Sequence, residues 1–123
     1  MAFDPSLAGE AYCYLTTTGR RTGDPHTIEI WFGMPPDGHT LYLLSGGGAR
    51  SDWVRNLMAD PAVTIRLGAR NAQVIEANAR VVGPGDEDHA ARELLAAKYQ
   101  GWDGTSTMSS WARTALAVAL EPD

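Results

Sequence analysis

Short strand-like segments, separated by glycine and proline turns, limit most strongly what this chain can fold into. Residues 26–34 alternate apolar and polar side chains, with Ile28, Ile30 and Phe32 facing one way, as in a half-buried strand. The Pro-Pro-Asp-Gly sequence at 35–38 favours a hairpin turn directly after this segment. Similar patterns predict further strands at 11–18, 40–45, 62–67, 72–82 and 111–120.

Only two segments have the pattern of helices. Residues 51–59 carry an apolar stripe behind Ser51, a typical N-cap residue. Residues 86–100 begin with three acidic residues and end before Gly101. Two helices cannot supply the crossovers of a doubly wound parallel sheet. We therefore expect a mainly β (α+β) fold in one domain, residues 1–123, built as a small antiparallel barrel that is closed or nearly closed.

The composition excludes several classes of function. The chain has 123 residues, enough for one domain, and its 10 basic and 15 acidic residues give a net charge of −5. That balance argues against general binding to nucleic acid or to anionic lipid. No apolar run approaches the ~18 residues of a membrane span, so no membrane association is expected. The first ten residues lack the basic start of a secretory signal, and we expect a cytoplasmic protein.

The metal-binding and nucleophilic residue types are sparse. Cys13 is the single cysteine and lies within a predicted strand, where a small core residue is a better interpretation than a nucleophile. The three histidines have no metal-like spacing, so no metal site is expected.

Two loops have the composition of anion-binding sites. Residues 16–23, Thr-Thr-Thr-Gly-Arg-Arg-Thr-Gly, place Arg20 and Arg21 on a tight turn, although a solvated hairpin tip would have the same residues. Residues 45–51, Ser-Gly-Gly-Gly-Ala-Arg-Ser, lead from a strand into a helix start, where backbone N–H groups attract anions; a flexible connector is equally compatible. If 40–45 pairs with 26–34, and 26–34 with 11–18, both loops lie at one end of the sheet. The sequence then favours an anionic ligand at that rim.

The four tryptophans exceed what a small core needs, so one or two of them are expected to line a pocket for a flat ring. Asn56 follows Trp53 by one helical turn and lies near the same side of the predicted helix, either toward a ligand or toward solvent. Glu29 is on the polar face of its strand, where solvent, a partner subunit and the ligand cavity all remain open.

Two motifs in succession carry a family resemblance. Residues 14–25, Tyr-Leu-Thr-Thr-Thr-Gly-Arg-Arg-Thr-Gly-Asp-Pro, resemble the first hairpin of the deazaflavin-dependent nitroreductase family. Residues 43–48, followed by Trp-Val-Arg-Asn-Leu at 53–57 and Asp-Pro-Ala-Val at 60–63, resemble its second signature. Residues 113–122 are similar to its closing strand.

The resemblance implies a split β-barrel, related to the flavin-binding pyridoxamine-phosphate-oxidase-like barrels, with six or seven antiparallel strands in Greek-key-like order and two or three helices. It implies coenzyme F420, a deazaflavin with a phosphate and an oligoglutamate tail. The implied reaction is hydride transfer to a small organic acceptor such as a quinone, an enone or a nitroaromatic, by a homodimer. Alternatives are an enzyme of the same fold that uses FMN, a non-catalytic deazaflavin-binding protein, and an interaction module.

By position, the resemblance assigns the charged end of the cofactor to the two arginines and the glycine loop, and its ring to the helix that follows. The implied cofactor-binding residues are Thr18, Arg20, Arg21, Ser45, Gly46, Gly47, Gly48, Ala49, Arg50, Ser51, Trp53 and Asn56. Trp31, Trp102 and Trp111 are expected to shape the acceptor site. Tyr99 or water is the expected proton donor to the acceptor.

Overall fold

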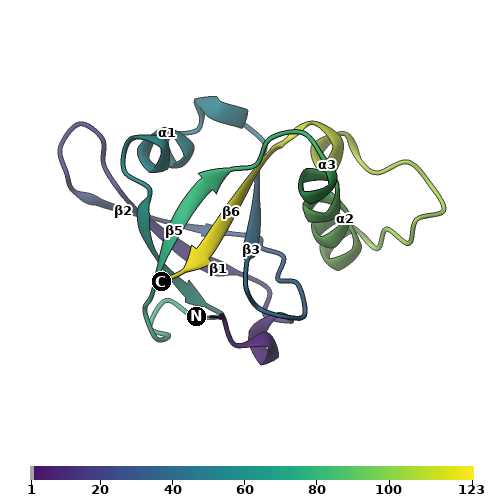
Figure 1. Cartoon of the computed structure of the whole chain (residues 1–123), viewed down its shortest axis with the longest axis horizontal. Coiled ribbons are helices and arrows are strands. Elements are labelled where there is room, and N and C mark those ends of the chain that lie inside the picture. The colour runs from purple at the N-terminus through teal and green to yellow at the C-terminus, as the bar shows by residue number, and fades with distance from the viewer. Residues whose placement is uncertain (1) are drawn as a thin grey trace.

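A single antiparallel sheet forms the body of the protein in the computed structural model, which describes residues 2–123 (Figure 1). Its strands are β1 (Cys13–Thr18), β2 (Pro25–Ile30), β3 (Leu41–Ser45), β4 (Ala62–Leu67), β5 (Ile75–Val81) and β6 (Leu116–Pro122). They pair in the order β2-β1-β4-β5-β6-β3, so that β2 and β3 are the two edges of a curled half-barrel. The expected mainly β, split-barrel fold is confirmed.

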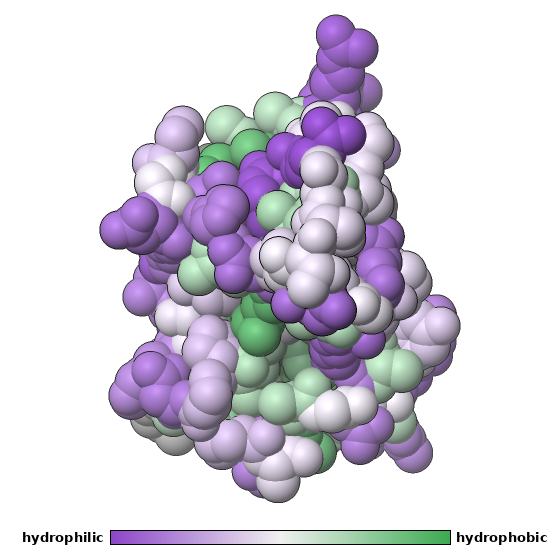
Figure 2. Space-filling model, turned by 90° about the vertical axis from the view of Figure 1, so that its right-hand side faces the viewer, coloured by the Kyte–Doolittle hydropathy of each residue, from purple (hydrophilic) through white to green (hydrophobic). Residues whose placement is uncertain are grey.

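The helices cover the sheet at two places. They are α1 (Asp52–Ala59), α2 (Asp86–Gln100) and α3 (Ser110–Thr114), and two 3-10 turns lie at η1 (Pro5–Leu7) and η2 (Gly48–Arg50). Helix α1 lies over one end of the half-barrel and inserts Val54 and Leu57 into its core, whereas α2 and α3 lie together on the other side (Figure 1). The side that carries α2 and α3 shows hydrophobic residues only in small patches, one of them in a hollow near its middle (Figure 2).

The expected pairing of β3 with β2 is wrong. β3 pairs with β6 along its whole length, from Leu41 opposite Leu120 to Ser45 opposite Leu116. Within the described residues, the segment that follows β2 makes one isolated bridge to β3, between Gly33 and Tyr42. Prolines 35 and 36 lack the N–H groups that a continuing ladder needs, and all five residues of β3 are buried. A strand buried on both faces requires a buried neighbour, which β6 supplies and the exposed β2 does not.

The predicted strand at 111–120 is also partly wrong, because residues 110–114 form α3 and the strand begins at Leu116. The Ser109 hydroxyl accepts a hydrogen bond from the Ala112 N–H at 3.1 Å and caps this short helix. The predicted strands at 11–18, 26–34 and 72–82 are shorter in the structure, while α2 and β4 have the predicted bounds.

The apolar core has two parts, one on each face of the sheet. The interior of the half-barrel includes Cys13, Leu15, Phe32, Leu43 and Ile65, all fully buried. The second part packs α2 and α3 against the outer face of β3 and β6, and includes Leu44, Ala91, Leu95, Ala115 and Ala117. Burial raises the pKa of the Cys13 thiol to about 12, so this cysteine is a core residue and not a nucleophile.

A charged cluster joins α2 to the sheet and makes the free energy of unfolding depend on pH. Arg80 donates two hydrogen bonds of 2.7 Å to the Glu87 carboxylate, which also accepts the Tyr42 hydroxyl at 2.8 Å. The Arg80 contacts lower the pKa of Glu87 from 4.5 to about 2. A lowered carboxyl pKa stabilises the folded state above about pH 4.5, and this stabilisation is lost as the pH falls toward 2.

We expect Glu87→Gln to lower the free energy of unfolding at neutral pH and to flatten its decline between pH 5 and pH 2. Urea denaturation at a series of pH values measures both effects. The control is Glu93→Gln on the same helix, where the carboxylate contacts His89 and no arginine. If the free energy of unfolding fell equally steeply with pH in wild type and in Glu87→Gln, Glu87 would not be the source of the acid sensitivity.

Candidate functional site

The hairpin between β1 and β2 is fastened to helix α1 by Arg20 and Asn56. The Asn56 Oδ1 atom accepts hydrogen bonds from the Arg20 backbone N–H at 3.2 Å and from its guanidinium Nη1 at 2.8 Å. The Asn56 amide donates to the Thr17 hydroxyl at 3.1 Å, and the guanidinium contacts Asp52 at 3.2 Å. Only 3% of Asn56 is exposed. Arg20 is therefore held against α1, and not free at a solvated hairpin tip.

The glycine loop that precedes α1 is closed by its own serines. The buried Ser45 hydroxyl donates to the Gly48 carbonyl at 2.9 Å and lies 2.7 Å from the Ser51 hydroxyl. A Cβ atom at Gly47 would lie 2.5 Å from the Ser51 oxygen, and Gly48 has φ +62°, which favours glycine at both positions. Ser51 occupies the N-cap position, but its side chain makes no capping bond. The first N–H groups of α1 are thus left without a side-chain cap.

A polar cavity of about 560 Å³, here called the cation cleft, lies between the hairpin and α1. Its lining residues are Gly19, Arg20, Arg21, Thr22, Asp24, His26, Thr27, Ile28, Asp52, Trp53 and Asn56. Four of the twelve expected cofactor-binding residues therefore come together in one cavity. The expected residues 45–51 form the loop next to it and are not part of its lining, and Thr18 borders a different depression on the sheet.

A second cavity has a volume of about 480 Å³ and lies at the C-terminal end of β2. We call it the aromatic cavity. It is lined by Tyr12, Glu29, Ile30, Trp31, Leu44, Gln100 and Trp111. Trp31 meets Trp111 edge to face, with ring centroids 5.5 Å apart. Trp102 is not part of this lining, because its indole N–H donates to the Ser106 carbonyl of its own loop at 2.8 Å. Tyr12 and Gln100 are additional lining residues that no sequence motif marked, and Glu29, whose surroundings the sequence left open, borders this cavity.

The two cavities are neighbours along β2. Ile28 lines the cation cleft and Ile30 lines the aromatic cavity, and residues two apart on a strand share one face at a spacing of about 7 Å. On the opposite side, a Cβ atom at Gly46 would lie 3.4 Å from the Trp111 ring, so the glycine loop reaches the aromatic cavity as well. A charged cavity and a flat apolar cavity thus lie side by side.

Tyr99 lies behind the aromatic cavity. Its ring stacks on Trp31 with centroids 4.3 Å apart and planes 2° from parallel. Its hydroxyl accepts the Phe32 N–H at 3.0 Å and lies within hydrogen-bond distance of the Ala11 carbonyl, at 2.8 Å, and the Phe32 carbonyl, at 3.1 Å. Burial raises the pKa of Tyr99 to about 12. Tyr99 as proton donor stays a prediction, and in the structure its hydroxyl is already bonded to the backbone.

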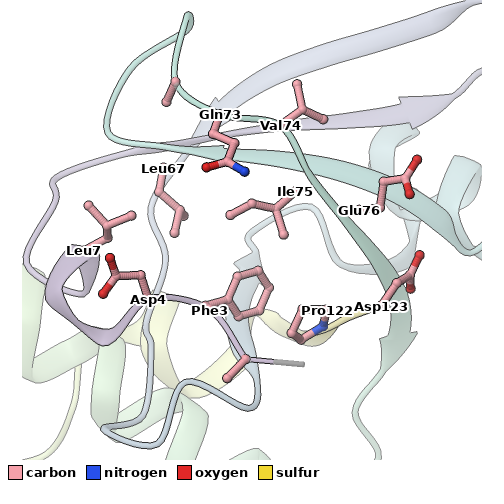
Figure 3. A pocket seen from close by; sticks show the side chains of 12 residues that line it. Phe3, Asp4, Leu7, Leu67, Gln73, Val74, Ile75, Glu76, Pro122 and Asp123 are labelled. Atoms are coloured by element: carbon pink, nitrogen blue, oxygen red, sulfur yellow. The ribbon is translucent and has the colours of Figure 1, made fainter.

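A larger cavity, of about 670 Å³, lies between the two ends of the chain (Figure 3). Its floor is apolar and includes Phe3, Leu67 and Ile75, and its charged lining residues are Asp4, Glu76 and Asp123. None of its lining residues is basic, so it has no cationic side chain to pair with an anion. It shares no residue with the cation cleft or the aromatic cavity.

Comparison with known proteins decides which family this arrangement represents. The profile of the F420H(2)-dependent quinone reductase family matches residues 5–121. The chain belongs to this family. The predicted resemblance is therefore confirmed, and so is coenzyme F420 as the cofactor of the family.

The relatives differ in how far they match. An F420H(2)-dependent quinone reductase of Mycobacterium tuberculosis is 35% identical over 77 residues, which span 62% of this chain and 50% of the relative. A structure described as an F420 reductase aligns with TM-score 0.64 and 22% identity over 96% of this chain and 91% of its own. A putative pyridoxamine 5'-phosphate oxidase from Listeria innocua aligns with TM-score 0.67 and 17% identity over 95% and 87%. The two structures establish the split-barrel fold.

Among residues 2–123, no helix has the length and apolar character needed to cross a membrane. Within the same residues, no three His, Cys, Asp or Glu side chains are grouped as metal ligands would be.

Proposed function

We propose that this protein transfers a hydride from reduced coenzyme F420 to a small organic acceptor, a quinone in particular. The observation that carries the proposal is the pair of neighbouring cavities, one lined by two arginines and one aromatic, in a chain of the F420H(2)-dependent quinone reductase family. The charged part of the cofactor needs the first environment, and a planar acceptor beside the cofactor ring needs the second.

The residues of the cation cleft fit the charged part of such a cofactor. Arg20 enters the cleft preorganised by Asn56, and Arg21 adds a second guanidinium. Forked guanidinium groups bind phosphate and carboxylate oxygens in pairs. The uncapped N–H groups at the start of α1 and the loop of residues 45–51 add backbone donors nearby. Trp53 supplies an aromatic wall of the same cleft.

The aromatic cavity fits a planar, uncharged acceptor. Trp31 and Trp111 supply aromatic surface, and Leu44 and Ile30 supply aliphatic surface. When bound, the reduced deazaflavin supplies the hydride. The protein contributes proximity, orientation and a site shielded from water. Water is the simplest source of the proton for the acceptor, since the Tyr99 hydroxyl is bonded to the backbone.

We also propose a homodimer in the cytoplasm. The aromatic cavity is bordered by Tyr12, which is 42% exposed, and by the edge strand β2. A second subunit packed there would close the cavity against water. Size-exclusion chromatography with light scattering measures the mass directly.

The decisive experiment is titration with oxidised F420, with FMN in parallel, followed by turnover with reduced F420 and a quinone such as menadione. We expect F420 to bind and the quinone to be reduced. Tight FMN binding without F420 affinity would favour the FMN enzyme, and F420 binding without turnover of any quinone, enone or nitroaromatic would favour a carrier.

Arg21→Ala tests the cleft without disturbing the fold, because the Arg21 side chain makes no hydrogen bond or ion pair within residues 2–123. We expect about tenfold weaker F420 binding, from the loss of one charged partner, and an unchanged free energy of unfolding. Arg113→Ala, on α3, is the matched control and should bind F420 as wild type does. Wild-type affinity in Arg21→Ala would remove this residue from the site.

A further inference from the structure

A small polar cavity lies on the outer face of the sheet, outside both cavities described so far. Its volume is about 280 Å³, and we call it the arginine cleft. It is lined by Tyr14, Thr16, Thr27, Arg66 and Arg70. The strand register explains the grouping, since Tyr14 lies opposite Arg66, and Thr16 lies opposite Thr27. Three neighbouring strands therefore present their polar residues on one face.

The two arginines of this cleft have donors to spare. Arg66 donates to the Arg70 carbonyl, and the Arg70 guanidinium lies 4.7 Å above the Tyr14 ring. Neither forms an ion pair within residues 2–123, whereas Arg20, Arg80 and Arg92 each contact a carboxylate there. Most of their N–H groups are thus left for a ligand.

The remaining groups of the cleft also suit an oxyanion. The hydroxyls of Thr16 and Thr27 lie 2.7 Å apart and bond to each other, so one of the two keeps its hydrogen for an outside acceptor. The carboxylate on the same face, Glu29, accepts the Tyr14 hydroxyl at 2.8 Å and lies outside the lining. Glu76, which lies opposite Thr64 on β5, is a second carboxylate of this face and is also outside the lining. The lining itself carries two guanidinium charges and no carboxylate.

The arginine cleft adjoins the cation cleft. Thr27 borders both, and it lies on β2, the edge strand, which has no strand on its other side. A flexible anionic chain held at Arg20 and Arg21 can therefore pass around this edge to the outer face.

We propose that the arginine cleft is a second oxyanion-binding site, taking a carboxylate or phosphate group through Arg66 and Arg70. The oxyanion has two possible sources: the charged tail of the molecule held in the cation cleft, or a separate small anion. Only the first source rests on the proposed function.

The cleft itself is tested with tri-γ-glutamate and inorganic phosphate as probes, by NMR titration of the backbone amides and the arginine Nε–H groups. We expect saturable shifts at Thr16, Thr27, Arg66 and Arg70. The double variant R66Q/R70Q should bind the better probe at least about tenfold more weakly, while R113Q binds it as wild type does. Absence of saturable shifts at these residues, or equal binding by the double variant, overturns the proposal.

The source is tested with F420 molecules that carry one or several glutamyl residues. If the tail reaches the cleft, the longer form binds wild type about tenfold more tightly, and R66Q/R70Q removes that difference while leaving the short form unchanged. If affinity is independent of tail length and the probes still bind, the site serves a separate anion. If neither form of F420 binds, the proposed function fails, and the probe titration still decides the cleft.

Discussion

Replacing Asn56 with alanine is expected to lower the free energy of unfolding by about 3 kcal/mol, the largest effect of any single polar substitution in this site. The buried amide accepts two hydrogen bonds from Arg20 and donates one to Thr17. The alanine side chain cannot replace the amide, so the Arg20 donors and the Thr17 hydroxyl lose a partner inside the protein. An unpaired polar group away from water costs more free energy than its hydrogen bond contributes. Urea denaturation measures the loss.

The same variant is expected to weaken F420 binding, because Arg20 loses the group that holds it in the cation cleft. A double-mutant cycle with Arg20→Ala separates this positioning effect from general destabilisation. We expect the affinity losses of the two variants to be far from additive. Arg55→Ala, exposed on the same helix, is the control for changes in α1 alone. Additive losses would mean that Asn56 does not act through Arg20.

Replacing Tyr99 with phenylalanine is expected to lower the free energy of unfolding by about 1–3 kcal/mol and to leave the quinone-reductase kcat nearly unchanged. The ring still stacks on Trp31, but the hydroxyl no longer joins Phe32 and Ala11. The two segments that it connects are the start of β1 and the end of β2, which border the aromatic cavity.

This variant also decides the role of Tyr99 in catalysis. A proton donor contributes about 10²–10⁴-fold to rate, so a loss of that size with unchanged stability would show that Tyr99 is the donor and that the backbone contacts are incidental. The control for stability is Tyr14→Phe, whose hydroxyl contacts Glu29 on an exposed face and should change the free energy of unfolding by less than about 0.5 kcal/mol. Urea denaturation and steady-state kinetics with menadione are the two measurements.

The sequence identified the functional motifs, but it did not predict the contacts that their residues make. The hairpin arginines and the glycine loop were recognisable because their residue types are those that oxyanions require at a turn and at a helix start. The role of Asn56 was not, since a polar residue on a predicted helix has the same local pattern whether it faces solvent or a buried hydroxyl 39 positions earlier. Trp102 and Trp111 were equivalent by composition, and the structure places one in its own loop and the other in the aromatic cavity.

Local pattern determined most strand and helix segments of this chain, including α2 and β4 to the residue, because side-chain period, caps and turn residues within a few positions set the backbone conformation. The short helix α3, which was predicted as part of a strand, is the exception. The pairing of β3 with β6, and not with its sequence neighbour β2, was decided by tertiary structure alone. Burial on both faces of β3 is a property of what packs against it, and that partner lies about seventy residues further along the chain. The placement of the cation cleft beside the aromatic cavity follows from this pairing, since it leaves β2 as the open edge along which both cavities lie.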